Sequence, residues 1–581
     1  MLWGTPGGNV VATRTDGQAM PESDSYDLIV LGAGAAGLAA ACVAAAEGMR
    51  VLLAEKTDKI GGTTAWSGGM VWAPVNGKMA AVGRTDTPEA ARTYLAHTVP
   101  GTEGAASRTA FLDHAAEAVD YLEAHTQLRL RPVATYPDYY PDQPGATAGG
   151  RVLEPCPFDA SALGADFAML RPPLPEFTLF GGMMIGRADI VHFRRVGRSI
   201  ASTWRVAKLI GAYALQRLNA SRGTTLYLGN ALAGWLLLSA RKLGVEIATN
   251  TAALALTGNA GGVDGVVLRG PNGERRVRAR RGVVLATGGF SHDKALRQLH
   301  LSPHAGLVSA VAPGNTGDGA RMALSLGASI GVGQEGGAFW VPASRFTRAD
   351  GSPAVFPHTV TDRSKPGVIA VDGTGRRFTN EARSYHEFVL AMLRNSNTQA
   401  SPAWLICDRT FLWRYGLGRI KPFTVRVRGY LKDGYLHSAA TPQALAARIG
   451  VDPAALADTI AGYNVGARQG RDDAFGRGGD IYQRHLGDGA HQPNPCVAPI
   501  EQPPFYAVAV YPADLGTSNG LVTDAEARVL GADGGPIKGL YSCGNDMHSV
   551  MNGAYPGPGI TLGPALTFGY LAARHAASTV E

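Results

Sequence analysis

Short apolar runs and glycine-rich turns alternate near the beginning of the chain. Residues 26–31 form an apolar run of strand length, an alanine-rich segment covers residues 38–47, and residues 51–54 are a second apolar run. Uninterrupted apolar runs of this length are typical of strands buried in a parallel sheet, and the alanine-rich segment between them is typical of a crossover helix. The pattern predicts a strand–helix–strand unit at the start of the folded chain.

The turn between the first run and the helix reads Gly-Ala-Gly-Ala-Ala-Gly over residues 32–37. In a Rossmann-type unit the first glycine allows the tight turn, the second lets backbone N–H groups approach a pyrophosphate, and the third lets helix and strand pack closely. Glu55 ends the second strand, where an acidic side chain accepts hydrogen bonds from an adenosine ribose. The unit therefore predicts a bound dinucleotide.

A second glycine-rich stretch follows over residues 59–69, which read Lys-Ile-Gly-Gly-Thr-Thr-Ala-Trp-Ser-Gly-Gly. A protein that binds only NAD does not need such a loop here, whereas the isoalloxazine of FAD must be held beyond the pyrophosphate. Two more segments favour FAD: a strand that runs into a glycine turn at residues 282–289, and residues 539–546 near the C-terminus. We therefore predict that the cofactor is FAD.

The positions of these segments predict an α/β fold. A Rossmann-type FAD-binding domain would be built from both chain ends, with an α+β substrate or catalytic domain inserted between them. We expect a flexible N-terminal extension at 1–24, the first part of the FAD-binding domain at 25–345, the inserted domain at 346–514, and the C-terminal part of the FAD-binding domain at 515–581. The extension is polar and lacks the cationic start and apolar core of a signal peptide.

The stretch 190–245 reads as helices with nine Lys or Arg and no Asp or Glu, beside apolar residues such as Ile200 and Trp204. A basic amphipathic helix is typical of proteins that lie on an anionic membrane. An ordinary helical subdomain with a solvated basic face is the interpretation that the sequence favours somewhat more. Peripheral membrane contact is the second hypothesis. Further along the chain, Asp452 followed by Pro453 predicts the start of a helix.

Composition narrows the remaining classes of function. The net charge is +7 over 581 residues and no nucleic-acid-binding pattern is present, so we expect no nucleic acid partner. Five cysteines lie far apart without a C-x-x-C pair, which argues against disulfides and zinc and favours a cytoplasmic location. His358, Asp362 and His386 lack metal-ligand spacing, so no metal is expected. No uncharged stretch reaches the ~20 apolar residues of a membrane span.

Several motifs resemble the fumarate reductase/succinate dehydrogenase flavoprotein superfamily: the FAD unit, residues 314–319, residues 376–381 and the C-terminal strand. Within it, residues 136–142 with 154–159, residues 380–385, 504–517 and 555–559 are similar to 3-ketosteroid Δ1-dehydrogenases, and the likeness extends over nearly all of 25–580. Fumarate reductases carry an acidic residue where Asn545 stands and an arginine-bearing loop where this chain has none at 553–559. The resemblance therefore favours a ketone over a dicarboxylate substrate.

The resemblance implies FAD-dependent desaturation of a 3-ketosteroid or related cyclic ketone, with a proton lost from the α carbon and a hydride passed from the β carbon to flavin N5. By resemblance, Tyr555 and the backbone N–H of Gly559 would hold the ketone oxygen, Tyr385 would be the base and Tyr139 would polarise it. A free phenol has a pKa of about 10, so a tyrosine base needs hydrogen-bond donors to its anion.

The motifs and the resemblance together imply which residues bind FAD, and an external electron acceptor, for which a quinone is a candidate, would reoxidise it. The expected cofactor-binding residues are Gly32, Gly34, Ala35, Ala36, Gly37, Glu55, Lys56, Gly61, Gly62, Thr63, Thr64, Ser67, Gly68, Gly69, Ala286, Thr287, Gly288, Asp318, Gly544, Asn545, Gly559 and Leu562.

Alternatives remain open at three points. Tyr136 stands where the steroid enzymes typically carry a less polar aromatic, so a smaller, non-steroid cyclic ketone is an alternative substrate. A flavin-dependent alkene reductase of the fumarate reductase type is the alternative reaction, although no C-x-x-C-H haem site is present. The third alternative is a different class of protein, one that binds a membrane surface and keeps FAD only for structural reasons.

One further motif match has no functional meaning. Residues 516–520 match the G-x-S-x-G hydrolase pattern, but a strand or turn rather than a helix is expected after them, so we interpret the match as accidental.

Overall fold

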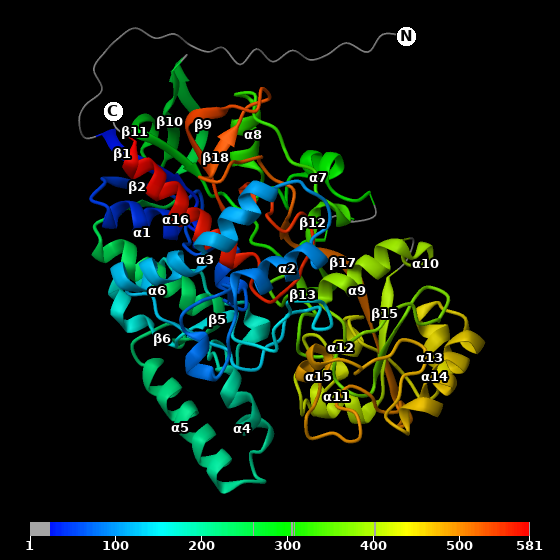
Figure 1. Cartoon of the computed structure of the whole chain (residues 1–581). Coiled ribbons are helices and arrows are strands. Elements are labelled where there is room, and N and C mark those ends of the chain that lie inside the picture. Colours follow the sequence, from blue (N-terminus) through cyan, green and yellow to red (C-terminus); the bar gives the residue numbers. More distant parts are fainter. Residues whose placement is uncertain (1–23, 260, 304–305, 307, 400–401, 580–581) are drawn as a thin grey trace.

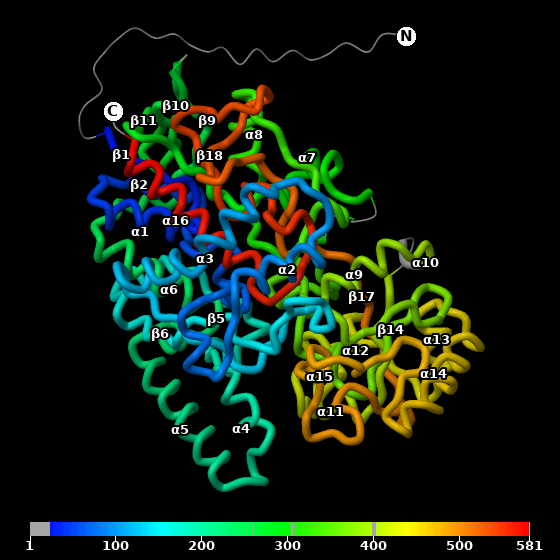
Figure 2. Tube along the Cα trace, viewed as in Figure 1, coloured from blue at the N-terminus to red at the C-terminus, as the bar shows by residue number. Residues whose placement is uncertain are grey.

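The protein is described by a computed structural model, which covers residues 24–259, 261–303, 306, 308–399 and 402–579. The predicted extension 1–24 lies outside these residues except for Asp24. Figure 1 shows two bodies, each built around a sheet, and a pair of helices that projects from the first body. In Figure 2 the blue N-terminal and red C-terminal segments lie together in the first body. The fold is α/β, as predicted.

A largely parallel sheet organises the first body. Its central order is β18-β19-β11-β1-β2-β8, in which β1 pairs in parallel with both β11 and β2 and the C-terminal β19 pairs in parallel with β11. The strands are β1 Ser25–Leu31, β2 Val51–Ala54, β8 Glu246–Ala248, β9 Ala252–Asn259, β10 Gly262–Gly270, β11 Gly273–Leu285, β18 Arg528–Leu530 and β19 Pro536–Ser542. The predicted strands 26–31, 51–54, 282–285 and 539–542 are confirmed.

Helix α1 (Ala35–Ala46) packs between the sheet and the C-terminal helix α16 (Leu562–Ser578). Small side chains make this close packing possible, because most of α1 is alanine and all but its last two residues are buried. The helix begins three residues earlier than predicted, because its N-cap is Gly34 inside the glycine turn. Also near this body are α2 Pro88–Thr98, α3 Ala105–His125, α7 Lys294–His300, α8 Asp318–Leu324, β3 Val71–Trp72, β4 Leu130–Pro132 and β5 Val152–Pro155.

The second body contains an antiparallel sheet of order β13-β12-β17-β15-β14, with β16 also paired to β17. The boundaries predicted at 345/346 and 514/515 fall inside β12 and β17, so the second sheet extends beyond them on both sides. Its elements are β12 Ala338–Thr347, β13 Pro353–Pro357, β14 Val368–Val371, β15 Ala403–Cys407, β16 His437–Ala439, β17 Phe505–Thr517, α9 Tyr385–Arg394, α10 Ser396–Gln399, α11 Arg409–Tyr415, α12 Arg428–Lys432, α13 Pro442–Ile449, α14 Pro453–Ala467 and α15 Ile481–Leu486. Helix α14 starts at Pro453 with Asp452 as its N-cap, as predicted.

The basic stretch is helical, as predicted. Helices α4 (Ile190–Arg194) and α5 (Ile200–Gln216) form the projecting pair in Figure 1, whereas α6 (Leu228–Lys242) packs against α1. In the chain, β7 (Thr225–Leu226) lies between α5 and α6, and it pairs with β6 (Phe158–Asp159). The stretch therefore divides into a buried helix and an exposed pair of helices. Within the described residues no helix is long and apolar enough to cross a membrane.

Candidate active site

The glycine turn lies at the carboxyl end of β1, against β11. A Cβ on Gly32 would lie 2.3 Å from the carbonyl oxygen of Ala286, and a Cβ on Gly37 would lie 1.9 Å from the carbonyl oxygen of Gly32. Gly32 also has a φ of +103°, a conformation that favours glycine. A Cβ on Gly34 would meet only Thr64 Oγ1, at 3.8 Å. Backbone contacts thus require two of the glycines, while the third leaves space in front of the turn.

That space suits a pyrophosphate. The N-cap of α1 is Gly34, which has no capping side chain, so the amide N–H groups that follow Ala35 in the first turn can donate to an anion. Thr64 Oγ1 accepts a hydrogen bond from Ala35 N (3.0 Å) and connects the second glycine-rich loop to the turn. The Glu55 carboxylate lies beside the turn, where it accepts from Ala33 N (3.0 Å) and Thr57 N (2.9 Å). The residues present fit the phosphate and ribose end of FAD.

The remaining predicted cofactor residues come from several segments that follow the strands of the first sheet. Lys56 Nζ forms an ion pair with Asp318 (2.5 Å), and Thr63 Oγ1 accepts from Ala312 N (3.1 Å). Thr287 donates from its N–H and its hydroxyl to the buried Asp546. The others lie in the loop at 61–69, the turn at 286–288 and the segment 544–545, namely Gly61, Gly62, Ser67, Gly68, Gly69, Ala286, Gly288, Gly544 and Asn545, with Ala36 of α1 beside Gly544.

A small pocket of about 20 Å³ is lined by residues of β17 and α16. Phe339, Asn545 and Thr561 are among its lining residues, and Leu562 begins α16 next to it. Asn545 follows β19 of the first sheet and Thr561 precedes α16, whereas Phe339 belongs to β12 of the second sheet. The pocket therefore lies between the glycine-turn side of the first body and the second body.

Tyrosines from three distant segments meet beside that pocket. The Tyr139 hydroxyl donates to the Tyr385 hydroxyl at 3.2 Å. The Tyr555 ring lies 5.7 Å from the Tyr139 ring and 5.2 Å from the Tyr385 ring, centroid to centroid. All three side chains are buried. The structure therefore brings together three residues that the sequence selected from separate motifs.

Gly559 follows Tyr555 in a tightly packed loop. Its φ is +94°, and a Cβ there would lie 2.6 Å from the backbone of Met70. The Gly559 carbonyl oxygen accepts from Trp72 N (3.1 Å), while its own N–H makes no hydrogen bond within the described part of the chain. A backbone donor is thus available four residues after Tyr555 in the same loop.

The loops that carry Tyr139 and Tyr555 are bonded directly to each other. Tyr139 N donates to Pro556 O (2.9 Å), and the Tyr94 hydroxyl donates to the same oxygen (2.5 Å). Asp138 fixes the first loop by accepting from Trp72 Nε1 (2.8 Å) and from the buried Arg151 (2.8 Å). The relative positions of the two tyrosines therefore depend on buried polar groups rather than on mobile side chains.

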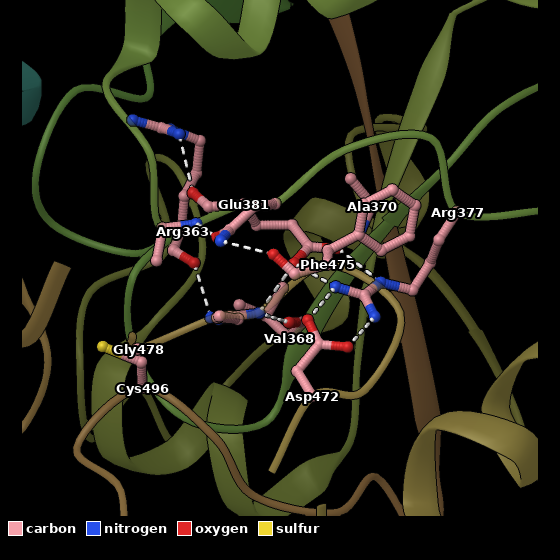
Figure 3. A network of polar contacts seen from close by, with 12 residues as sticks. Arg363, Val368, Ala370, Arg377, Glu381, Asp472, Phe475, Gly478 and Cys496 are labelled. Atoms are coloured by element: carbon pink, nitrogen blue, oxygen red, sulfur yellow. Dashed lines mark hydrogen bonds and ion pairs between the residues drawn. The ribbon is translucent and has the colours of Figure 1, made fainter. Parts of the chain in front are cut away.

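A separate buried network holds the segment before Tyr385 (Figure 3). Glu381, which is fully buried, accepts from Arg377 (2.9 and 2.8 Å), from Arg477 (3.1 Å) and from Ala370 N (2.9 Å). Arg363 Nη1 donates to the carbonyl oxygens of Glu381 (2.8 Å) and Arg383 (3.2 Å). These contacts fix the backbone that enters α9, whose first residue is Tyr385.

Burial dominates the acid–base properties of the cluster. It raises the pKa of Tyr385 and of Tyr139 well above the usual value of a phenol, and raises the pKa of Tyr555 to about 12. The hydrogen bond from Tyr139 opposes this effect at Tyr385, because a donor stabilises the phenolate. Hydrogen bonds from Tyr385 and Thr561 likewise lower the pKa of Tyr555, whereas the hydrogen bond with Tyr555 raises that of Tyr385.

Sequence reasoning missed one member of the cluster. The Tyr482 ring lies 4.6 Å from the Tyr139 ring, and its buried hydroxyl has no hydrogen-bond partner among the described residues. It lies on the short helix α15, in a segment with no motif. His386, set aside as a metal ligand, instead accepts from Trp340 N (3.1 Å) and contacts Glu335 (2.8 Å), with its ring 5.7 Å from that of Tyr555.

Two groups of residues resemble sites of other protein classes, and the structure argues against both interpretations. His358 contacts Asp362 (2.6 Å) and Ser344 (3.0 Å) in an arrangement like a hydrolase triad, but all three side chains are buried. The described residues directly after Ser518 form no helix, so the G-x-S-x-G match lacks its structural context. No group of potential metal ligands occurs in the described ranges, and all five cysteines, each within those ranges, are unpaired.

Comparison with known proteins gives one family and several close relatives. Residues 27–562 match the FAD binding domain family. The chain is similar to 4-oxocyclohex-2-ene-1-carboxylate 5-dehydrogenase of Sinomonas cyclohexanicum (40% identity; 95% of this chain, 93% of that protein) and to 3-oxosteroid 1-dehydrogenase of Mycobacterium tuberculosis (37%; 95% and 98%). Among solved structures, 3-ketosteroid delta1-dehydrogenase from Sterolibacterium denitrificans in complex with 1,4-androstadiene-3,17-dione matches with a TM-score of 0.89 and 38% identity, over 96% of this chain and all of that one.

Proposed function

This chain belongs to the FAD binding domain family and is an FAD-dependent oxidoreductase, and on that premise we propose that it desaturates a cyclic ketone beside its carbonyl group. The observation that carries the proposal is the hydrogen bond between Tyr139 and Tyr385 beside Tyr555, in a buried cluster next to the pocket. The named activities of the relatives, which are dehydrogenations of steroid or cyclohexene ketones, support it.

Two donors would hold the ketone oxygen. The Tyr555 hydroxyl and the Gly559 N–H are close in sequence, and the loop that carries them is tied to the Tyr139 loop. As the α proton leaves, negative charge develops on the ketone oxygen, and donors that are already in place stabilise it. Burial keeps Tyr555 protonated at neutral pH, since its pKa is about 12, so its hydroxyl stays a donor.

Tyr385, as its phenolate, would take the α proton on the phenolic oxygen and become a neutral phenol. The electron pair of the broken C–H bond moves towards the carbonyl, and the departure of a hydride from the β carbon completes the new C=C bond. Bound FAD supplies the acceptor for that hydride. The Tyr139 hydroxyl donates to Tyr385 and thereby makes its anion accessible in a buried site.

The test uses the FAD-loaded protein and an artificial electron acceptor with a panel of cyclic ketones. We expect ketone-dependent dye reduction, and we expect Tyr385→Phe to retain FAD while losing about a thousandfold in kcat. Flavin absorbance measures the retained cofactor. Wild-type turnover in Tyr385→Phe would remove this residue from the mechanism, and the absence of dye reduction with every ketone would overturn the function itself.

The exposed helices α4 and α5 support a second part of the proposal, contact with an anionic membrane surface. Ile200 is 91% exposed, Trp204 63% and Leu215 68%, on helices that project from the body (Figure 1). Basic residues surround them and acidic ones are absent from 190–245. Apolar and cationic side chains on one exposed helix suit insertion at a lipid headgroup surface, and a quinone in the same membrane is the electron acceptor that this contact would bring near.

Co-sedimentation with vesicles tests this contact. We expect binding to vesicles that contain phosphatidylglycerol, weaker binding to pure phosphatidylcholine, and loss of binding in the double variant Ile200→Ser, Trp204→Ser. The matched control is Val425→Ser with Leu299→Ser. This double variant removes two apolar side chains of similar exposure (82% and 75%) that lie outside residues 190–245. Equal binding by both double variants, or no binding by the wild type, would contradict membrane contact.

A further inference from the structure

Arg187 lies one side chain away from the tyrosine cluster. The Arg187 guanidinium is centred 5.0 Å from the Tyr136 ring, and its Nη1 lies 4.0 Å from the sulfur of Met70. Tyr136 is buried, and its hydroxyl contacts Tyr139. The backbone of Met70 packs against Gly559. Arg187 therefore touches both residues that separate it from the proposed ketone site.

The charge of Arg187 is only partly balanced. Its nearest carboxylate is Glu154, at 3.7 Å, which is longer than a hydrogen bond. Glu154 is already held by Arg131, with contacts of 2.7 and 2.9 Å to its other oxygen. One carboxylate thus serves two guanidinium groups, and a net positive charge remains.

Other groups near Arg187 do not cancel that charge. His485 stacks against Tyr136 at 4.7 Å, and burial together with Arg187 and Lys365 lowers its pKa to about 4, so it is neutral at physiological pH. Lys365 Nζ donates to the carbonyl oxygens of Leu486 (2.5 Å) and Gly487 (2.7 Å). Arg187 is 32% exposed, which leaves its donors accessible to a ligand.

Resting on the proposed function, we propose that the substrate is a cyclic ketone that carries a carboxylate, and that Arg187 binds this carboxylate while Tyr555 and Gly559 hold the ketone oxygen. The two polar groups would lie at opposite ends of one six-membered ring. A planar guanidinium recognises a carboxylate with paired hydrogen bonds, and a half-buried position strengthens them.

The same arrangement disfavours two other substrates. An uncharged steroid would place apolar carbon against a guanidinium without supplying an acceptor, which costs desolvation energy. A dicarboxylate such as fumarate would need a second cation where Tyr555 and Gly559 lie, and the segment 553–559 contains no arginine. One cation and one pair of oxyanion donors match one carboxylate and one ketone.

The experiment compares 4-oxocyclohexanecarboxylate with its methyl ester, which has the same ring without the charge. In FAD-loaded wild type we expect a lower KM for the acid. Arg187→Gln should raise the KM for the acid by about tenfold to a hundredfold, with kcat and the KM for the ester nearly unchanged. Arg187→Lys should restore part of the preference. Cyclohexanecarboxylate, which lacks the ketone, should inhibit the wild type and lose affinity in Arg187→Gln, as a readout that needs no turnover of the ligand.

Two variants make the test specific. Glu154→Gln removes the competing carboxylate and should lower the KM for the acid, the opposite sign to Arg187→Gln. Arg131→Gln releases Glu154 to pair with Arg187 and should therefore raise the KM for the acid, with the same sign as Arg187→Gln and a smaller size. An equal KM for acid and ester in wild type, or equal effects of Arg187→Gln on both, would overturn the carboxylate proposal while desaturation stands. Failure to oxidise either ketone or any steroid would instead overturn the proposed function.

Discussion

The cofactor region and the tyrosine cluster are built in different ways. The glycine turn and its strand–helix–strand unit lie within a short stretch of chain, and backbone contacts of Gly32 and Gly37 determine their shape. The tyrosine cluster draws on four segments spread over residues 139–555, and buried polar groups such as Glu381 and Asp138 set its geometry. The first region depends on local backbone conformation, and the second on the whole tertiary fold.

Substitutions in the two regions should therefore impair the protein in two different ways. A change in the glycine turn should remove the cofactor, because the turn has space for FAD and little else. A change in the tyrosine cluster should remove turnover and leave the cofactor bound, because none of the hydroxyls contributes to the contacts of the glycine turn. Substitutions chosen from the two regions can therefore test whether cofactor binding and ketone chemistry are separable.

The largest effect is expected at the glycine turn. Gly37→Val places a branched side chain where a Cβ would already be 1.9 Å from Gly32 O, so we expect a poorly folded protein without FAD. Gly34→Val is the matched control, because a Cβ there meets only Thr64 Oγ1 at 3.8 Å. We expect that variant to fold but to lose FAD, since its side chain occupies the ligand space. Circular dichroism reports the fold and flavin absorbance the cofactor. A yellow, folded Gly37→Val would show that this contact is not required.

A smaller effect is expected at Gly559. Gly559→Ala introduces a Cβ 2.6 Å from the Met70 backbone at a φ of +94°, which moves the N–H that would face the ketone oxygen. We expect kcat to fall by about a hundredfold while flavin remains bound. Stopped-flow reduction of the flavin by ketone measures this step directly. Full activity would mean that Tyr555 alone stabilises the developing charge.

The sequence was sufficient for the region that depends on local backbone. The apolar runs and glycines at 26–55 predicted β1, α1 and β2 to within a few residues, because buried parallel strands and a crossover helix have strong local signals. The start of α1 was placed too late, since the glycine turn itself supplies the N-cap.

The sequence was less informative for the second region. Tyr139, Tyr385 and Tyr555 were found only through resemblance, since one tyrosine has no local feature that marks its role. Tyr482 and Arg187 were missed altogether, because their significance comes from what they touch in the fold. No periodicity indicates that a residue in α15 will face one in the 133–151 loop.

The smallest effect, and the one most specific to the second region, is expected at Tyr139. Burial raises the pKa of Tyr385, so its reactive anion becomes more abundant as pH rises, and log kcat/KM should increase with a slope of about one per pH unit below that pKa. Tyr139→Phe removes the donor that lowers this pKa, so it should shift the profile to higher pH and lower kcat/KM at any fixed pH on the slope. Tyr482→Phe is the control, because its hydroxyl makes no hydrogen bond to the described residues, and it should leave the profile in place. An unshifted profile in Tyr139→Phe would mean that Tyr139 positions the loop without tuning the base.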